Sequence, residues 1–175
     1  MRRPKLPFRS VPRLRGSRCV VNKDVAVALQ VIYTYFREHG GEWPKFAYFE
    51  RWLDRYRKQD AILVINRIPR ALLRPVTFID GRPDPAGRLV LTAAGAGKCP
   101  GSDDDVQNLV AAVQYLVRHN TNYDLPDDPS ARGVPVSARQ LADELNLPLH
   151  SDPNSIMRLI SLLEGEGLVV SGVRS

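Results

Sequence analysis

One glycine-rich stretch with a lysine has the residue types of a phosphate-binding loop. Residues 89–101 read LVLTAAGAGKCPG, an apolar run followed by glycines and Lys98. A phosphate loop needs two glycines at fixed spacing, then Lys, then a Ser or Thr hydroxyl that holds Mg²⁺. Thr92 stands where the first glycine belongs, Cys99 stands where the hydroxyl belongs, and Pro100 follows where a helix should begin. We therefore expect no ATP or GTP binding here, and interpret Thr92 as a helix cap.

Other residue types that support catalysis or metal binding are scattered along the chain. The cysteines and histidines match no zinc-ligand spacing: Cys19, Cys99, His39, His119 and His150. The sequence contains no Gly-x-Ser-x-Gly, His-Glu-x-x-His or Cys-x-x-Cys motif. Three aspartates at 103–105 follow Ser102, and they are better explained as charges that complement a helix N-terminus, because consecutive helical side chains diverge. We expect a non-catalytic protein without cofactor or metal.

Positive charge is concentrated near the start of the chain, whose net charge is +6. Residues 1–18 contain three prolines, no acids and seven bases: Arg2, Arg3, Lys5, Arg9, Arg13, Arg15 and Arg18. Residues 37–74 carry nine bases and five acids, whereas residues 75–175 carry eight bases and thirteen acids. Such asymmetry concerns binding partners rather than fold, and a proline-interrupted basic arm is a known nucleic-acid-binding device. A disordered arm without a dedicated partner remains the alternative.

The first half of the body has the pattern of three helices followed by two strands. Helical periodicity predicts helices over residues 25–39, 45–59 and 61–75, the last divided by Pro69. Asn22 or Asp24 is predicted to cap the first of these helices, and Asp60 the third. Val76–Ile79 and Arg88–Leu91 read as strands joined by a long, flexible loop. A glycine-rich joint at residues 95–101 follows.

The second half predicts three more helices and a final strand. The helices are expected over residues 102–120, 136–147 and from 155 to Gly165 or Gly167, with Ser102 and Ser137 as caps. Residues 120–135 have the composition of a linker or exposed loop. A short strand is expected to begin at Leu168.

The order of these last elements resembles the winged helix-turn-helix of bacterial regulators over residues 102–171. The segment ARQLADEL precedes a helix that ends with Arg158, Leu163-Glu164 and Gly167-Leu168-Val169, the family's transition into a wing strand. Residues 25–98 show the same plan more faintly, with Leu91-Thr92 and Gly95 at the end of a wing. The resemblance implies a mainly α protein with small β wings (α+β). We expect a basic arm at 1–20 and two tandem winged-helix-like units at 21–98 and 102–175.

In helix-turn-helix proteins the N-terminal residues of the second helix of the motif reach base edges in the major groove. The basic half therefore predicts the main contacts, which are the seven bases of the arm together with Lys45, Arg51, Arg55, Arg67, Arg70, Arg74, Arg82 and Arg88. The acidic half supplies secondary recognition-helix candidates, Asn154, Ser155 and Arg158, which we expect to contribute little.

Two functions remain open from the sequence. The first is a transcriptional regulator that binds double-stranded DNA through the arm and the N-terminal unit. The second is an adaptor whose acidic C-terminal unit binds a protein or forms a homodimer, because winged helices also serve in protein binding. The chain has no apolar run of membrane-spanning length and no apolar segment near its start, so we expect a cytoplasmic protein without membrane contact.

Overall fold

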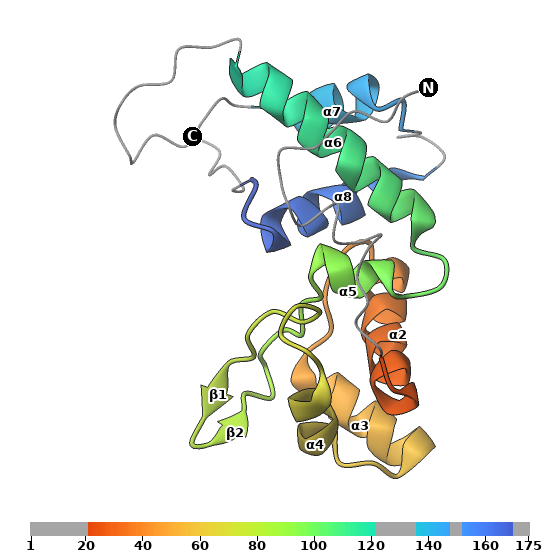
Figure 1. Cartoon of the computed structure of the whole chain (residues 1–175), viewed down its shortest axis with the longest axis vertical. Helices are drawn as coiled ribbons and strands as arrows, with labels where there is room; N and C mark the ends of the chain where they lie inside the picture. Colours follow the sequence, from red (N-terminus) through yellow and green to blue (C-terminus); the bar gives the residue numbers. More distant parts are fainter. Residues whose placement is uncertain (1–20, 122–135, 148–151, 170–175) are drawn as a thin grey trace.

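The structure, a computed structural model, describes residues 21–121, 136–147 and 152–169 (Figure 1). The helices are α2 (Lys23–Glu38), α3 (Phe46–Arg57), α4 (Ala61–Arg67), α5 (Ala93–Gly97), α6 (Asp103–Thr121), α7 (Ala138–Glu144) and α8 (Pro153–Gly165). The strands are β1 (Phe78–Ile79) and β2 (Arg82–Pro83), which pair antiparallel. The predicted class, mainly helical with a small β element, is confirmed. Figure 1 shows α2, α3, α4 and the hairpin at one end and α6, α7 and α8 at the other.

Side-chain caps fix the helix starts that the sequence predicted. Asn22 accepts the Val25 N–H at 2.8 Å, so Asn22 rather than Asp24 caps α2. Asp60 caps α4 and Thr92 caps α5 in the same way. Ser137 forms a reciprocal capping box at the start of α7. These four contacts satisfy backbone donors that have no partner within a helix.

The hairpin differs from the prediction. Residues 80–87 were expected to be a long loop, but β2 lies within them, and the strands are joined by the two-residue turn Asp80-Gly81. Both turn residues have a positive φ, 52° and 77°. This geometry suits the twist of a two-residue hairpin and favours an Asp-Gly pair. The turn signal was present in the sequence and was read as part of a larger loop.

The predicted strand Arg88–Leu91 is instead an extended segment that forms backbone hydrogen bonds with a neighbouring segment on each side. The Leu89 N–H donates to the Pro44 carbonyl at 2.8 Å, and the Arg74 N–H donates to the Val90 carbonyl at 2.8 Å. Isolated bridges pair Lys45 with Arg88 and Leu73 with Leu91. The chain returning from the hairpin therefore lies between the segment before α3 and the segment after α4.

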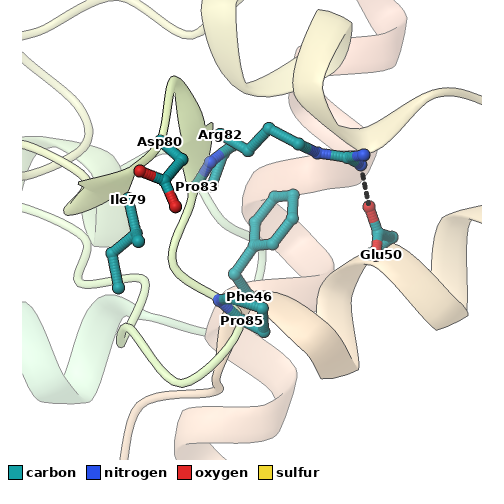
Figure 2. Close-up of a pocket in the computed structure, with 7 residues that line it drawn as sticks. All are labelled: Phe46, Glu50, Ile79, Asp80, Arg82, Pro83 and Pro85. Carbon is teal, nitrogen blue, oxygen red and sulfur yellow. Dashed lines mark ion pairs between the residues drawn. The ribbon is translucent and has the colours of Figure 1, made fainter.

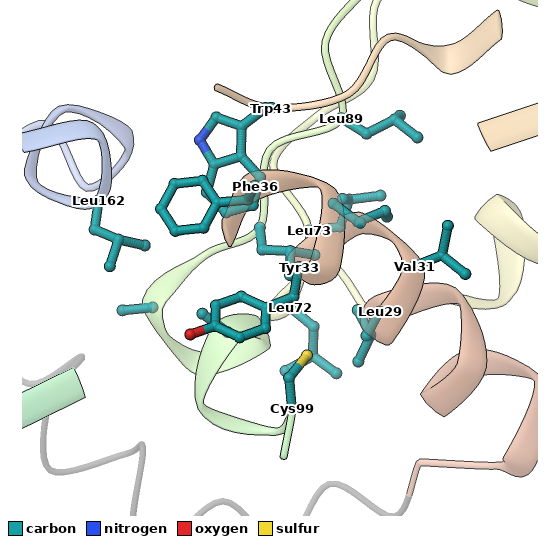
Figure 3. Close-up of a cluster of buried hydrophobic side chains, with 14 of the residues drawn as sticks. Leu29, Val31, Tyr33, Phe36, Trp43, Leu72, Leu73, Leu89, Cys99 and Leu162 are labelled. Carbon is teal, nitrogen blue, oxygen red and sulfur yellow. The ribbon is translucent and has the colours of Figure 1, made fainter. Parts of the chain in front are cut away.

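The hydrophobic core is one cluster to which both halves contribute. The rings of Phe36 and Trp43 stack at 4.1 Å, and Leu162 of α8 lies in the same cluster (Figure 3). Gly41 makes this approach possible, because a Cβ there would lie 2.9 Å from the Met157 carbonyl oxygen. The domain boundaries stay predictions, but α8 is packed against the first half as well as against α6.

Three smaller expectations can be compared with the described ranges. Tyr56 follows the apolar residues of α3 at helical spacing, which predicts an inward side chain, but it is 59% exposed. Leu168 and Val169 form no strand, and the rest of that predicted strand lies outside the described residues. None of the helices in the described ranges combines the length and apolar character needed to cross a bilayer.

Candidate nucleic-acid interface

The predicted arm cannot be placed, because it lies outside the described residues. This applies to Arg2, Arg3, Lys5, Arg9, Arg13, Arg15 and Arg18. The geometry of a nucleic-acid site therefore rests on the bases of the N-terminal half.

Those bases are distributed over α3, α4, the hairpin and the segments that flank them. Seven are exposed, namely Lys45, Arg51, Arg55, Arg67, Arg70, Arg82 and Arg88, while Arg74 is half-buried. Arg67 lies at the end of α4, Arg70 in the following turn, and Arg82 in β2. The structure thus places exposed arginines at the end of α4, in the turn after it and in the hairpin.

Two of these arginines have distant acidic partners that leave them accessible. Arg67 lies 3.9 Å from Asp24, and its side chain is 58% exposed. Arg82 lies 3.9 Å from Glu50 on α3, and its side chain is 72% exposed (Figure 2). Exposed ion pairs of this kind contribute about 0–1 kcal/mol. A phosphate can therefore replace either carboxylate at small cost.

Arg88 has a structural role that the sequence did not reveal. Its guanidinium donates to the Trp43 carbonyl oxygen at 2.7 Å and to Glu42 at 2.8 Å. These bonds hold the returning segment against the loop between α2 and α3. Short bonds to a backbone carbonyl and a carboxylate occupy the fork of the guanidinium, so Arg88 is a weak candidate for phosphate contact.

The secondary candidates on α8 need correction. Arg158 was proposed as a residue facing the major groove, but its side chain is only 7% exposed and its Nε donates to Asp105 at 3.1 Å. Ser155 is also buried, and Asn154 is exposed beside Gly40. The α8 face that would read bases is covered by α6 and by the first half of the protein. Of the three candidates, only Asn154 is exposed.

Asp105 is a buried carboxylate whose structural role sequence reasoning missed. Its carboxylate accepts the Tyr33 hydroxyl at 2.6 Å and pairs with Arg37 at 3.3 Å, in addition to Arg158. Burial, together with this bond to a carboxylate, raises the pKa of Tyr33 above its ordinary value. The three adjacent aspartates were treated as equivalent helix charges. Of the three aspartates, only Asp105 lies four residues before Leu109, which places it on the buried face of α6. This spacing was visible in the sequence and could have predicted its burial.

The glycine-rich loop is used for packing. Thr92 accepts the Gly95 N–H at 3.0 Å, as the cap interpretation predicted. A Cβ at Gly95 would lie 2.0 Å from the Leu72 carbonyl oxygen, so backbone fills the space beside this glycine. Cys99 is buried, and burial raises the pKa of its thiol to about 12. A neutral thiol is a poor metal ligand and nucleophile.

A cavity of about 320 Å³ lies between the hairpin and α3 (Figure 2). Phe46, Ile79, Pro83 and Pro85 give it an apolar lining, while the Arg82–Glu50 pair crosses its rim. This volume is near the lower limit for small-molecule sites. Among the residues that the structure describes, no three His, Cys, Asp or Glu side chains are grouped as metal ligands.

Comparison with known proteins does not assign the chain to a family: no family model, curated protein or solved structure matches it. The winged-helix resemblance therefore stays a prediction.

Proposed function

We propose that the protein binds double-stranded DNA non-catalytically through α4 and the hairpin, with the basic arm adding phosphate contacts, and that it acts as a transcriptional regulator. The observation that supports this most directly is the order of elements in residues 23–91. Helix α2, a segment ending at Lys45, helices α3 and α4, and a hairpin follow one another, and Arg88 in the extended segment after the hairpin bridges back to Lys45. This order resembles a winged helix-turn-helix, with α4 in the recognition position.

The charges at this end support a polyanionic partner. Arg70 has no ion-pair partner within the described ranges, and Arg67 and Arg82 have only distant ones. Phosphate contacts by such arginines release counterions and make affinity depend on salt. Asn66 and Arg67 are exposed at the C-terminal end of α4, and Arg and Asn side chains are able to donate hydrogen bonds to purines.

The acidic half has a different role in this proposal. Asp105 and Glu166 interact with the first half, through Tyr33 and through the Ala93 N–H. These two carboxylates are not available to recruit a partner, whereas Asp103, Asp104, Asp143 and Glu144 are exposed. We infer that α6, α7 and α8 brace the DNA-binding end, and that the adaptor function has less support than DNA binding.

The test is binding of generic duplex DNA to the full chain at several salt concentrations. We expect log affinity to fall linearly with log salt, and Arg70→Gln to lower the slope by about one unit. Arg139→Gln is the matched control, because Arg139 is exposed on α7 in the acidic half. Deleting residues 1–18 should weaken binding to all sequences similarly. Absence of salt-dependent binding, or equal effects of Arg70→Gln and Arg139→Gln, would refute the proposal.

A further inference from the structure

A stripe of aromatic side chains on α3 is left unexplained by duplex binding. Tyr48, Trp52 and Tyr56 follow one another at intervals of four residues, so they project from one face of the helix. The Trp52 and Tyr56 rings are 5.1 Å apart, and Tyr56 is 59% exposed. We call these three residues the aromatic stripe.

The stripe lies beside the face of α3 that carries the buried residues Phe46, Phe49 and Leu53. Tyr48 and Trp52 are half-buried and pack against the core with one side, whereas Tyr56 is exposed. A large aromatic side chain left more than half exposed gains little from burial, and Tyr and Trp in such positions are typical of binding surfaces.

Arginines are interleaved with the stripe. Arg51 and Arg55 follow Tyr48 and Trp52 by three residues, and both are exposed. The Arg55 guanidinium lies over the Tyr56 ring, 5.4 Å from its centroid. In the described part of the chain neither arginine forms an ion pair. Flat rings and unpaired guanidinium groups therefore alternate along one helix face.

The surface continues from α3 onto the end of α2. The Tyr35 ring lies 4.7 Å from that of Tyr48, and the exposed His39 ring stacks on Tyr35 at 3.7 Å. Glu38 is the acidic group near this end, where it helps to raise the pKa of Tyr48, after the larger effect of burial. The positive charge of the surface thus lies toward the Arg51–Arg55 end.

We propose that the aromatic stripe with Arg51 and Arg55 binds single-stranded nucleic acid, by stacking unpaired bases on the rings and pairing phosphates with the arginines. In a duplex the base faces are stacked on one another and are not available to side chains, whereas in a single strand they are. Alternating rings and cations match alternating bases and phosphates. From Tyr48 to Tyr56 the helix rises by about 12 Å, which gives the stripe an extended length. Arg51 and Arg55 were also predicted to contact duplex DNA; this proposal assigns them to the single strand and leaves Arg67, Arg70 and Arg82 as the proposed duplex contacts.

Fluorescein-labelled oligothymidylate and oligouridylate of about 20 nucleotides provide the test, with anisotropy measured on the full chain at about 50 and 200 mM salt. The two oligomers separate a DNA from an RNA ligand. We expect salt-dependent binding and quenching of Trp52 emission. Trp43 is buried against Phe36, so it should not report the contact. Trp52→Phe keeps a ring and should retain most of the affinity while losing the quenching.

Two matched variants locate the effect. Tyr56→Ala should weaken single-strand binding roughly 5- to 150-fold, the range found for loss of one base–aromatic stack, and leave duplex affinity unchanged. Phe78→Ala removes a ring of similar exposure from the hairpin and should leave single-strand binding unchanged. Arg55→Gln should lower the salt slope for the single strand.

Four results would overturn the inference: no single-strand binding at either salt concentration, equal losses for Tyr56→Ala and Phe78→Ala, anisotropy without quenching, or a change of assembly state in Tyr56→Ala by sedimentation velocity. The last would show that the stripe is a protein–protein contact. Failure of duplex binding alone leaves this site standing, because the two tests use different variants.

Discussion

Helices α4 and α8 occupy the same place in the chain order of their halves, but their arginines differ in exposure to solvent. Each is the third helix of its half and carries an arginine that was predicted from the sequence to contact DNA. The Arg67 side chain on α4 is 58% exposed, whereas the Arg158 side chain on α8 is 7% exposed and paired with a buried carboxylate. A helix-turn-helix pattern therefore predicts where a helix lies in the chain, and the surrounding elements decide whether it can reach a ligand.

The largest expected effect comes from removing the buried arginine. Arg158→Ala leaves the Asp105 carboxylate without its buried cation, and we expect a loss of about 3–5 kcal/mol in the free energy of unfolding. Arg67→Ala removes an exposed pair and should cost at most about 1 kcal/mol. Urea denaturation of both variants measures the difference. Similar losses for the two variants would mean that α8 is no more tightly held than α4.

This expectation changes how Arg158 can be used as a control. The sequence suggested that Arg158→Ala would leave DNA affinity nearly unchanged. A variant that unfolds would lose affinity for reasons unrelated to contact with DNA. Arg139→Gln on α7 avoids the problem, because Arg139 is exposed and no ion pair joins it to the rest of the described chain.

The packing of α8 against the first half can be tested by substituting Gly41. Gly41 has a φ of +92°, and a Cβ there would lie 3.0 Å from the Arg158 Cα. Gly81 in the hairpin turn has a φ of +77° with nothing within 4 Å. Both Ala variants incur backbone strain of about 1–2 kcal/mol, but Gly41→Ala also crowds α8 and should lose about 3 kcal/mol in all. Thermal unfolding of the two variants measures the difference, which reports the contact between residue 41 and α8. Equal losses of stability would argue against close packing of α8 at this position.

Local structure was predictable from the sequence because it depends on neighbouring residues. The caps at Asn22, Asp60 and Ser137 follow from short polar side chains placed before apolar stripes. The end of α2 follows from Gly40 and Gly41, whose positive φ values suit a residue without a Cβ. The hairpin was misplaced for a related reason: several turn residues follow Asp80 closely, and the prediction gave them equal weight.

Contacts between distant segments were not predictable in the same way. Tyr33 and Asp105 are separated by 72 positions, and no local pattern joins them. Arg88 looked like any other arginine of an arginine-rich chain until its bond to the Trp43 carbonyl became visible. The exposure of the candidate arginines was accordingly predicted best on α4, where local periodicity sets it, and worst on α8, where it depends on contacts with a distant part of the chain.

The dependence of stability on pH reports on the buried Cys99 thiol, which follows α5. Burial raises the pKa of the Cys99 thiol from 9.0 to about 12, so the unfolded chain releases this proton at lower pH than the folded one. Stability should therefore fall as pH rises from about 9 toward 12, by up to about 1.4 kcal/mol per pH unit. Cys99→Ala removes this contribution and should show a shallower decline. Parallel pH profiles for the two proteins would mean that the thiol is open to solvent.

The smallest effect expected concerns Arg74, a predicted DNA contact that also crosses between the halves. Its guanidinium lies 4.0 Å from Glu166, with 39% of the side chain exposed, so Arg74→Gln should change the free energy of unfolding by less than about 0.5 kcal/mol. Glu166→Gln should cost more, about 1–2 kcal/mol, because Glu166 also accepts the Ala93 N–H at the start of α5. If Arg74 meets a phosphate, Arg74→Gln nevertheless lowers the duplex salt slope by about one unit. An unchanged slope together with a large loss of stability would reverse the assignment and give Arg74 a structural role like that of Arg158.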